Sequence, residues 1–362
     1  MKKTHDSHTI IFLVASLGSG GSERVVSLLA NSMVERGQEV EIICLKYDDV
    51  FYQTHKNVRI TLANKYASNF FFKLFWLRKY LKRRSPDVVI AFTEGVYCFA
   101  TCALLRTKIP IIASERNDPA HISWKRKFLK KIFLPHVDGF VVQTEHIKSY
   151  FKGSVANKVS VIHNPVNEEV FKSQTSRIEQ KDNRIVSVAR LYPQKNQEMM
   201  IRAFALIAHQ YPDWQLVIFG EGPKRQCLQL TIDNLQLTDR ILLQGRTAHV
   251  IEELRRSKFF CMSSDYEGMS NSMIEACCVG LPIISTKVSG TDELVEDGVN
   301  GYLVDTGDVE GMAKVMEKLI LDEKQISIMG DCSRAKASLF QIDGIVRKWF
   351  SVIEKYTTIR FL

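Results

Sequence analysis

The sequence has no apolar run long enough for a membrane-spanning helix, which needs about 20 such residues. The apolar run at 10–15 follows Lys2 and Lys3, as in a signal peptide, but it is short and polar residues at 5–8 interrupt the approach to it. We therefore expect this run to form a buried first strand.

Several motifs of metal and cofactor chemistry are also missing. The eight cysteines include no Cys-x-x-Cys pair and mostly lie in apolar runs, so we expect buried thiols in a reducing compartment rather than disulfides or a zinc site. No Asp-x-Asp pair follows an expected strand, and we expect no metal ion. The dinucleotide fingerprint is incomplete, because Gly18 and Gly20 would require a glycine where Glu23 stands. This disfavours a nicotinamide enzyme.

The chain does have an uneven excess of basic residues. Its net charge is +9; residues 1–166 carry 25 Lys and Arg against 13 Asp and Glu, and the rest carries 24 against 27. A basic half indicates a polyanionic partner, either nucleic acid or an acidic membrane surface. The 45% apolar and 25% charged content is typical of a soluble globular protein, and 362 residues suffice for two domains.

Apolar, strand-like runs alternate with helical stretches, which predicts α/β domains with parallel sheets covered on both faces. The polar segment at 166–183 divides two such series. We therefore predict two doubly wound, Rossmann-like domains, at 1–166 and 167–341, with ligands beyond the carboxyl ends of the strands. The expected strands lie near 9–15, 40–44, 88–92, 109–113, 139–142 and 159–162, and near 184–188, 215–219, 241–243, 259–262, 282–285 and 301–304.

Two glutamates, Glu267 and Glu275, follow the expected strand at 259–262. Gly268 permits a sharp turn, and the residues at 270–272 are all suitable helix N-caps. Glu267 is thus expected in the loop, and Glu275 in the first or second helical turn. A helix N-terminus attracts a phosphate, and carboxylates accept hydrogen bonds from hydroxyls beside it. The pair indicates a nucleotide sugar, unless both are solvated acids at a helix start.

Two cations, Arg190 and Lys195, stand at the end of the expected strand at 184–188. They can converge on one diphosphate, with arginine as a bidentate fork and lysine as a point charge. The alternative is a pair of solvated surface cations. Turns at 219–223 and 244–246 follow the next two strands, and either could frame a nucleobase.

Glycine-rich and polar loops follow strands of the first half as well. The segment Gly-Ser-Gly-Gly-Ser-Glu-Arg at 18–24 opens a helix; it lets backbone approach a ligand closely or forms only a tight turn. Polar residues at 93–95 and 114–119 follow two later strands and are expected to face a cleft between the domains. For the second loop, a turn capped by Asp118 before Pro119 is the alternative.

Two expected helices of the basic half, at 69–84 and 122–135, combine aromatic residues with cations. In the first, a stripe from Phe70 to Leu81 suffices for a core, which leaves other aromatics without a core role. This composition is typical of helices on anionic lipid, so we expect membrane contact; nucleic acid and an ordinary helix with a solvated basic face are the alternatives. The cations expected to face the membrane or the acceptor are Lys79, Arg83, Arg126, Lys127, Lys130 and Lys131.

Together and in order, these residues resemble the retaining, GT4-like group 1 glycosyltransferases of the GT-B fold. The resemblance implies two domains facing each other across a cleft, with a last helix within 342–362 crossing back to the first. The segments at 16–24 and 114–119 also look like the subgroup that extends polyprenyl-diphosphate-linked saccharides. The matching pieces are Gly-Gly-Ser-Glu-Arg at 20–24, His-Asn-Pro at 163–165, Arg190 with Lys195 and Asn196, Glu267 to Glu275, Gly-Leu-Pro at 280–282 and Asp-Gly-x-Asn-Gly at 297–301.

The resemblance also implies roles for single residues. Arg190 and Lys195 would neutralise the donor diphosphate, Glu275 would hold the ribose hydroxyls, and Glu267 would contact the transferred sugar. Many relatives place a histidine near that sugar; the loop at 114–116 has none, and we take Arg116 as the polar group there. The catalytic set is Glu267, Arg190, Lys195 and Arg116, and the donor-binding set is Gly20, Gly21, Arg190, Lys195, Gly245, Met269, Ser270, Asn271 and Glu275.

The expected function is that of a cytoplasmic, membrane-peripheral, retaining glycosyltransferase of surface polysaccharide or glycan biosynthesis. Its donor is expected to be a UDP-linked hexose or N-acetylhexosamine, and its acceptor a polyprenyl-diphosphate-linked saccharide at the anionic inner leaflet. We expect front-face attack and no cofactor, metal or nucleic acid. The alternatives are a sugar-nucleotide epimerase of similar fold and a non-catalytic sugar-nucleotide-binding scaffold at a membrane.

Overall fold

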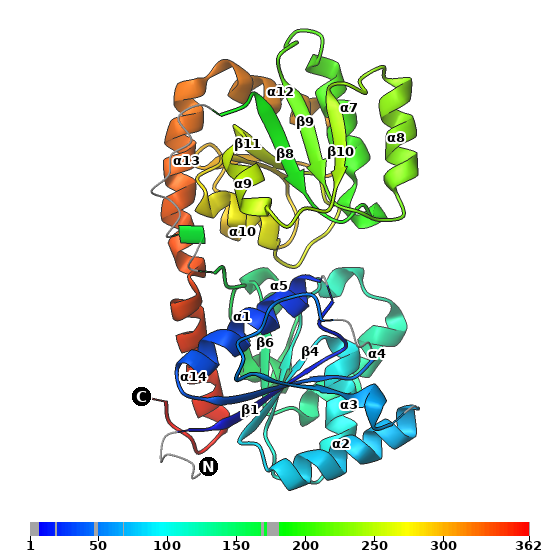
Figure 1. Ribbon diagram of the computed structural model, residues 1–362, viewed down its shortest axis with the longest axis vertical. Coiled ribbons are helices and arrows are strands. Elements are labelled where there is room, and N and C mark those ends of the chain that lie inside the picture. The colour runs from blue at the N-terminus through cyan, green and yellow to red at the C-terminus, as the bar shows by residue number, and fades with distance from the viewer. Residues whose placement is uncertain are drawn as a thin grey trace. The chain divides into compact units, whose positions relative to one another are not determined.

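The computed structural model describes residues 7–18, 20–46, 50–67, 69–167, 170–171 and 181–361. The chain divides into two structural units, drawn in Figure 1. The N-terminal unit comprises Met1–Pro165 and Phe340–Leu362, and the C-terminal unit is Val166–Leu339. The chain thus leaves the N-terminal unit after Pro165 and returns to it at Phe340.

The N-terminal unit is built on a seven-stranded parallel sheet with the order β3-β2-β1-β4-β5-β6-β7. The order reverses between β1 and β4, as in doubly wound sheets. The strands are β1 (Thr9–Val14), β2 (Glu39–Cys44), β3 (Arg59–Leu62), β4 (Val88–Phe92), β5 (Ile111–Ser114), β6 (Gly139–Val142) and β7 (Val159–Val161).

One of these strands, β3, is missing from the strands expected from the sequence. It lies at the edge of the sheet, and only Thr61 of its four residues is buried. An edge strand with one buried residue needs no apolar run, so its sequence carries no strand signal. The other strands of the unit lie where apolar runs predict them.

Helices cover both faces of this sheet. Apolar residues of α1 and α14 share one core with the sheet, and those of α2 and α3 share the other. The helices are α1 (Gly21–Glu35), α2 (Phe70–Arg84), α3 (Glu94–Leu104), α4 (Trp124–Phe133), α5 (Glu145–Ser149) and α14 (Ile342–Tyr356), with short 3-10 turns at η1 (Ala63–Lys65), η2 (Pro119–His121), η3 (Leu134–His136) and η4 (Gly153–Lys158).

The last helix, α14, belongs to the N-terminal unit through its apolar face. Its buried residues recur at intervals of three and four from Ile342 to Ile353, the spacing of one helical face. Trp349 is fully buried and stacks on Phe92 of β4, with 5.9 Å between ring centroids. The C-terminal end of the chain therefore completes a core that begins with β1.

The C-terminal unit contains a six-stranded parallel sheet with the order β10-β9-β8-β11-β12-β13, which reverses between β8 and β11. All six strands correspond to predicted apolar runs. They are β8 (Arg184–Val188), β9 (Gln215–Phe219), β10 (Ile241–Gly245), β11 (Phe259–Met262), β12 (Ile283–Thr286) and β13 (Gly301–Val304).

Helices pack on this sheet as well, α7 against α12 and α10 against α13. They are α7 (Gln197–Ile207), α8 (Arg225–Asn234), α9 (Val250–Arg255), α10 (Asn271–Cys278), α11 (Thr291–Leu294), α12 (Val309–Leu321) and α13 (Glu323–Ala337), and the 3-10 turn η6 (Pro193–Lys195) precedes α7. Two doubly wound α/β units confirm the predicted fold class. Among the described residues, no helix is both long enough and apolar enough to cross a bilayer.

Candidate active site

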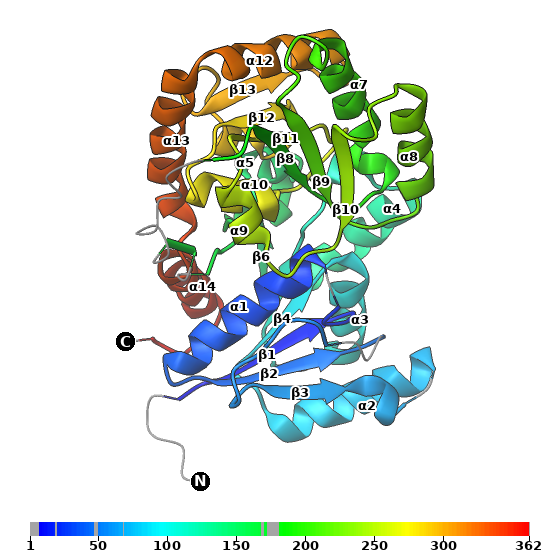
Figure 2. The same ribbon diagram turned by 45° about the horizontal axis from the view of Figure 1, so that its top comes forward.

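The carboxyl ends of β8 and β11 lie side by side, because these strands pair where the order of the sheet reverses; Figure 2 shows them next to each other. Open parallel sheets bind ligands at such a switch point. The loop after β8 carries Arg190 and Lys195, and the loop after β11 carries Glu267. Both predicted cations and one predicted acid therefore lie at one edge of one sheet.

Hydrogen bonds hold these two loops together. Nδ2 of Asn196 donates to Oδ1 of Asp265 over 2.8 Å, and Oγ of Ser263 donates to the carbonyl of Asn196 over 2.8 Å. Asn196 has a φ of +41°, in the left-handed region that asparagine tolerates better than most residues. This conformation ends η6 directly after Lys195.

Lys195 and Glu267 form an ion pair. Their side chains are only 14% and 9% exposed, and Ser264 donates a further hydrogen bond to the same carboxylate over 3.3 Å. Burial lowers the pKa of Lys195 to about 8, and the positive charge of Arg190 acts in the same direction. A second anion beside Lys195 would therefore stabilise its charged form.

Arg190 is exposed, and its guanidinium lies over the ring of Tyr192, with 4.9 Å from Cζ to the ring centroid. The turn after β9 holds its loop, because the amide of Leu191 donates to the carbonyl of Glu221 over 3.0 Å. A Cβ at Gly222 would collide with the carbonyl of Leu191, so this close approach needs a glycine. The backbone beside Arg190 is fixed while its charge remains accessible.

The two turns at 219–223 and 244–246, either of which could frame a nucleobase, are neighbours. The amide of Gly220 donates to the carbonyl of Gly245 over 2.7 Å. Gly245 ends β10 with a φ of +77°, a conformation that favours glycine. The predicted donor residue Gly245 therefore borders the turn that holds the Arg190 loop.

The helix that begins after Glu267 is α10. Ser270 is its N-cap, and its Oγ accepts a hydrogen bond from the amide of Met273, which satisfies one of the free amides of the first turn. The helix begins at Asn271, so Glu275 lies in its second turn, as predicted. Met269, Ser270 and Glu275 are all buried.

This edge of the sheet combines two cations with a helix N-terminus. Such a combination attracts a doubly charged group such as a diphosphate, and Glu267 and Glu275 offer acceptors for hydroxyls nearby. In the described part of the chain, no group of three or more His, Cys, Asp and Glu side chains is placed to hold a metal ion.

The predicted glycine loop lies at the switch point of the N-terminal unit, between β1 and β4. Gly20 is the N-cap of α1 and Gly21 its first residue, whereas Ser19 lies outside the described residues. At the end of β4, Thr93 has a φ of +73°. A β-branched residue in that region is strained by about 1–3 kcal/mol, and such strain concentrates at functional sites.

Arg116 follows β5 in the same unit and is 7% exposed. Its guanidinium lies over the ring of Phe92 at 4.7 Å, and its Nη1 donates to Oδ1 of Asn164 over 2.8 Å. Nε2 of Gln143 donates to the same oxygen over 2.7 Å. Gln143 and Asn164 are absent from the predicted site set. For Gln143 the only signal was its position just after β6, whereas Asn164 also stands in the matching piece His-Asn-Pro at 163–165. Neither signal shows which loops meet.

The six predicted membrane-facing cations do not all share one environment. The prediction for Lys130 is wrong: it is 5% exposed, and its ammonium pairs with Glu115 and, at 3.7 Å, with Glu94. Helical spacing groups Lys130 with the other cations of α4, but buried carboxylates from α3 and the loop after β5 turn it inward. The exposed members are Lys79, Arg83, Arg126, Lys127 and Lys131.

The outward faces of α2 and α4 combine apolar residues with cations. Lys130 is the only buried residue of α4. Phe70, expected in the core stripe, is 57% exposed and touches only the edge of the core through Phe99 of α3, at 5.2 Å between ring centroids. The exposed apolar residues of the two helices are Phe70, Phe71, Phe72, Phe75, Trp124, Phe128, Leu129 and Ile132.

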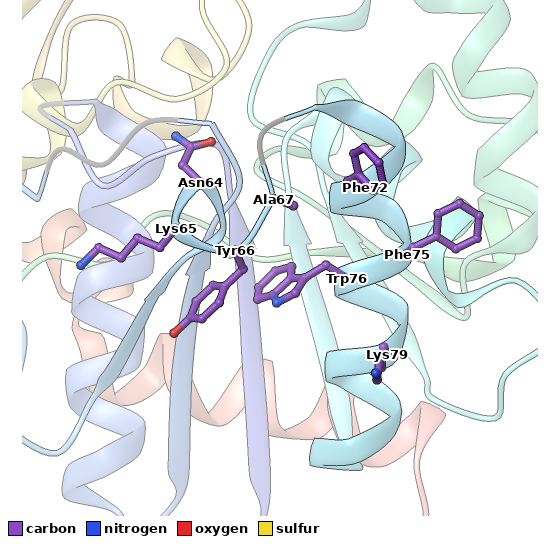
Figure 3. Close-up of a pocket in the computed structure, with 8 residues that line it drawn as sticks. All are labelled: Asn64, Lys65, Tyr66, Ala67, Phe72, Phe75, Trp76 and Lys79. Atoms are coloured by element: carbon purple, nitrogen blue, oxygen red, sulfur yellow. The ribbon is translucent and has the colours of Figure 1, made fainter.

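A hollow of about 570 Å³ lies between η1 and α2. Figure 3 shows the side chains that line it. The rings of Tyr66 and Trp76 stack within it at 5.3 Å, and Trp76 also stacks on Tyr80. Aromatic rings that end in polar groups, with lysines beside them, suit the headgroup level of a membrane. The lining residues are Asn64, Lys65, Tyr66, Ala67, Phe72, Phe75, Trp76 and Lys79.

Two doubly wound α/β units are the architecture of the GT-B fold. The crystal structure of Anabaena HepE in complex with UDP and glucose superimposes with a TM-score of 0.82 at 19% identity, over 96% of this chain and 99% of that chain. The family model Glycosyl transferases group 1 matches residues 169–336, and the model Glycosyltransferase Family 4 matches residues 19–170.

Relatives match along the whole chain. A Campylobacter jejuni protein named GalNAc-alpha-(1->4)-GalNAc-alpha-(1->3)-diNAcBac-PP-undecaprenol alpha-1,4-N-acetyl-D-galactosaminyltransferase is 30% identical over 95% of this chain and 98% of its own length. The amylovoran biosynthesis glycosyltransferase AmsD of Erwinia amylovora is 25% identical over 95% and 99%. This chain belongs to the group 1, family 4 glycosyltransferases, and it is a hexosyltransferase-type enzyme.

We expect Lys195→Met to lower the free energy of unfolding by about 3–5 kcal/mol, because it leaves the Glu267 carboxylate buried without its counter-charge. The double variant Lys195→Met with Glu267→Leu should recover most of that loss, since a well-packed apolar pair can replace a buried ion pair at little cost. Urea unfolding of the four proteins of this cycle measures the difference.

Arg190 is exposed, so Arg190→Met is the control for this cycle. It should change the free energy of unfolding by no more than about 0.5 kcal/mol. Losses that simply add in the double variant would contradict an energetic coupling between Lys195 and Glu267.

Proposed function

We propose that this enzyme transfers an N-acetylhexosamine or a hexose from a UDP-linked donor to a polyprenyl-diphosphate-linked saccharide, with retention and without a metal cofactor. The observation that carries the proposal is the cluster formed by Lys195, Arg190 and the N-terminus of α10 at the switch point. A donor diphosphate requires such positive charge. The two carboxylates, Glu267 and Glu275, then receive the sugar and ribose hydroxyls.

The similar proteins support the choice of donor and acceptor. HepE, the structural neighbour, was crystallised with UDP and glucose. The Campylobacter relative that spans this chain is named for transfer of N-acetylgalactosamine to an undecaprenyl-diphosphate-linked saccharide, and AmsD is named for biosynthesis of a polysaccharide. We assign this enzyme to the same chemistry in surface polysaccharide or glycan biosynthesis.

The proposed reaction depends on charge that the site holds in place before the donor binds. Cleavage of a glycosyl–phosphate bond develops positive charge on the sugar ring and negative charge on the departing diphosphate. Lys195 and Arg190 stabilise that negative charge with little rearrangement. As the diphosphate engages Lys195, Glu267 is released to accept a hydrogen bond from the sugar. The acceptor hydroxyl attacks from the face that the diphosphate leaves and gives its proton to the departing phosphate oxygen, which retains the configuration.

The proposed acceptor places the enzyme at the cytoplasmic face of a membrane. We name the exposed apolar and basic residues of α2 and α4 the docking surface. Its phenylalanines enter the lipid, and cations such as Lys127 and Lys131 meet lipid phosphates, each contributing on the order of 1 kcal/mol. The hollow beside α2 lies at headgroup level, with the stacked rings of Tyr66 and Trp76 inside it.

The two alternative functions suit these features less well. A sugar-nucleotide epimerase acts on a free nucleotide sugar and has no use for a docking surface. Membership of a glycosyltransferase family also favours catalysis.

Transfer of labelled sugar from UDP-N-acetylhexosamine to a polyprenyl-diphosphate-linked acceptor tests the assignment. Glu275→Ala and Arg190→Ala should each lower kcat/KM by about 10–100-fold, because each removes a charged hydrogen-bonding group from the donor. Glu310→Ala, an exposed acid in the first turn of α12, should leave the rate unchanged, and so should EDTA. Transfer by Glu275→Ala at the wild-type rate would show that the donor site is assigned wrongly.

The lowered pKa of Lys195 predicts a pH dependence of UDP affinity. Lys195 is charged below its pKa of about 8, and a bound diphosphate raises that pKa because it favours the ammonium form. Affinity should therefore fall as pH rises above 8, by up to about tenfold per pH unit. Calorimetric titrations with UDP between pH 7 and 10 measure this slope.

Lys195→Arg provides the control for the pH dependence, because arginine stays charged throughout this range. Its UDP affinity should hold steady from pH 7 to 10. A wild-type profile as flat as that of the arginine variant would mean that Lys195 does not titrate against the diphosphate.

Vesicle co-sedimentation tests the docking surface. Lys127→Glu with Lys131→Glu should weaken binding to anionic vesicles by about 30-fold or more, from the loss of two attractions of about 1 kcal/mol each, and leave binding to neutral vesicles unchanged. Phe71→Ser with Phe75→Ser should weaken binding to both kinds of vesicle, because it removes apolar area from the lipid.

The matched control is Lys314→Glu with Lys324→Glu, two exposed lysines of the C-terminal unit. It changes the net charge by the same amount and should leave binding nearly unchanged. Equal losses of vesicle binding in the two charge variants would show that net charge alone causes the effect. This result would refute a defined docking surface.

A further inference from the structure

Three neighbouring loops of the N-terminal unit meet at a buried polar cluster. Arg116, Gln143 and Asn164 follow β5, β6 and β7, which are adjacent parallel strands. Their carboxyl ends thus share one edge of the sheet. Oδ1 of Asn164 accepts from both Nη1 of Arg116 and Nε2 of Gln143. All three side chains are at most 7% exposed.

Among the described residues, the guanidinium of Arg116 forms no ion pair with a carboxylate, and Glu115 acts on it only through its charge. The nearest acid in sequence, Glu115, accepts hydrogen bonds from the amides of Arg116 and Asn117 through Oε1, at 3.0 and 3.2 Å, and its other oxygen pairs with Lys130. The Glu115 carboxylate is therefore already engaged. Nε and Nη2 of Arg116 have no hydrogen-bond partner among the described residues.

The remaining contacts leave one edge of Arg116 for a ligand. Phe92 lies against a face of the guanidinium, and Nη1 donates to Oδ1 of Asn164. Nε and Nη2 together form the edge that binds two oxygens of a phosphate or carboxylate at once. Oε1 of Gln143 also lacks a partner in the described structure, and it can accept a hydrogen bond from a hydroxyl beside that anion.

The electrostatics of the cluster favour an anion. Burial lowers the pKa of Arg116 to about 9, so the cation is desolvated but still charged at neutral pH. His163, which precedes Asn164, is neutral there, because burial lowers its pKa to about 4. A buried charge without a counter-ion is costly, and an arriving anion removes that cost.

We propose that Arg116 binds a phosphate group of a saccharide-bearing substrate through its Nε and Nη2 edge, and that Gln143 and Asn164 are the positioning residues that hold it. The inference rests on the proposed function for the source of that phosphate. Two substrates supply this chemistry: the UDP-linked donor and the polyprenyl-diphosphate-linked acceptor. The site requires bidentate geometry, so lysine should not replace arginine fully.

Calorimetry on the full chain with two probes, UDP and farnesyl diphosphate, tests the site. Arg116→Gln should weaken one probe by about tenfold or more, as expected for loss of a charged hydrogen bond, and Arg116→Lys should weaken the same probe less. Weakening of UDP identifies the donor as the source, and weakening of farnesyl diphosphate identifies the acceptor. Wild-type affinity for both probes in both variants overturns the proposal.

Asn164→Asp separates a positioning role from a merely structural one. Its carboxylate supplies Arg116 with an internal counter-ion, so we expect a higher midpoint of thermal unfolding together with weaker binding of the probe that Arg116→Gln affects. Gln143→Ala should weaken the same probe and lower the midpoint, because it removes a buried side chain that donates to Asn164. Unchanged probe affinity in both variants would refute the positioning roles.

Failure of this inference is distinguishable from failure of the proposed function. Lys195→Ala should abolish UDP binding in the C-terminal unit whatever Arg116 does. If the affinity for UDP depends on Lys195 and the affinity for neither probe depends on Arg116, the proposed donor site is supported and the phosphate site in the N-terminal unit is refuted.

Discussion

The pairing of β8 with β11 is the constraint on which the proposed donor site depends. It brings together Lys195 and Glu267, which are 72 positions apart in sequence, at the edge where a parallel sheet exposes its strand ends. The hydrogen bonds between the two loops, through Asn196 and Ser263, make the ion pair part of the scaffold. A diphosphate that enters this site meets charge that is already desolvated and oriented, which is the condition for electrostatic catalysis.

Buried ion pairs also determine the arrangement of side chains in the N-terminal unit. Buried carboxylates pair with Lys130, so this lysine points inward and α4 presents its apolar side chains to solvent. In water, such exposed apolar residues need polar neighbours. On a membrane, lipid would cover them. One of those carboxylates, Glu115, also fixes the amides that begin the Arg116 loop. The docking surface and the proposed phosphate site therefore share a single buried network.

Much of the fold was predictable because parallel strands buried on both faces must be apolar runs. Twelve such runs were identifiable and the edge strand β3 was not, since one buried residue leaves no pattern. The helix start at Ser270 and the place of Glu275 in the second turn follow from local capping preferences. The prediction for Lys130 was wrong because a helical pattern shows which residues share a face. It does not show which face packs against buried carboxylates of other elements.

The sequence by itself determined the fold class and the two series of strands, because these depend on hydrophobic period. Its ordered motifs carried the resemblance to the group 1 glycosyltransferases. Only the tertiary structure decided that Lys195 pairs with Glu267, that Gln143 and Asn164 hold Arg116, and that Lys130 is buried. Each of these contacts joins loops or helices that strand order places side by side, and desolvation then sets the strength and the pKa of the charges involved.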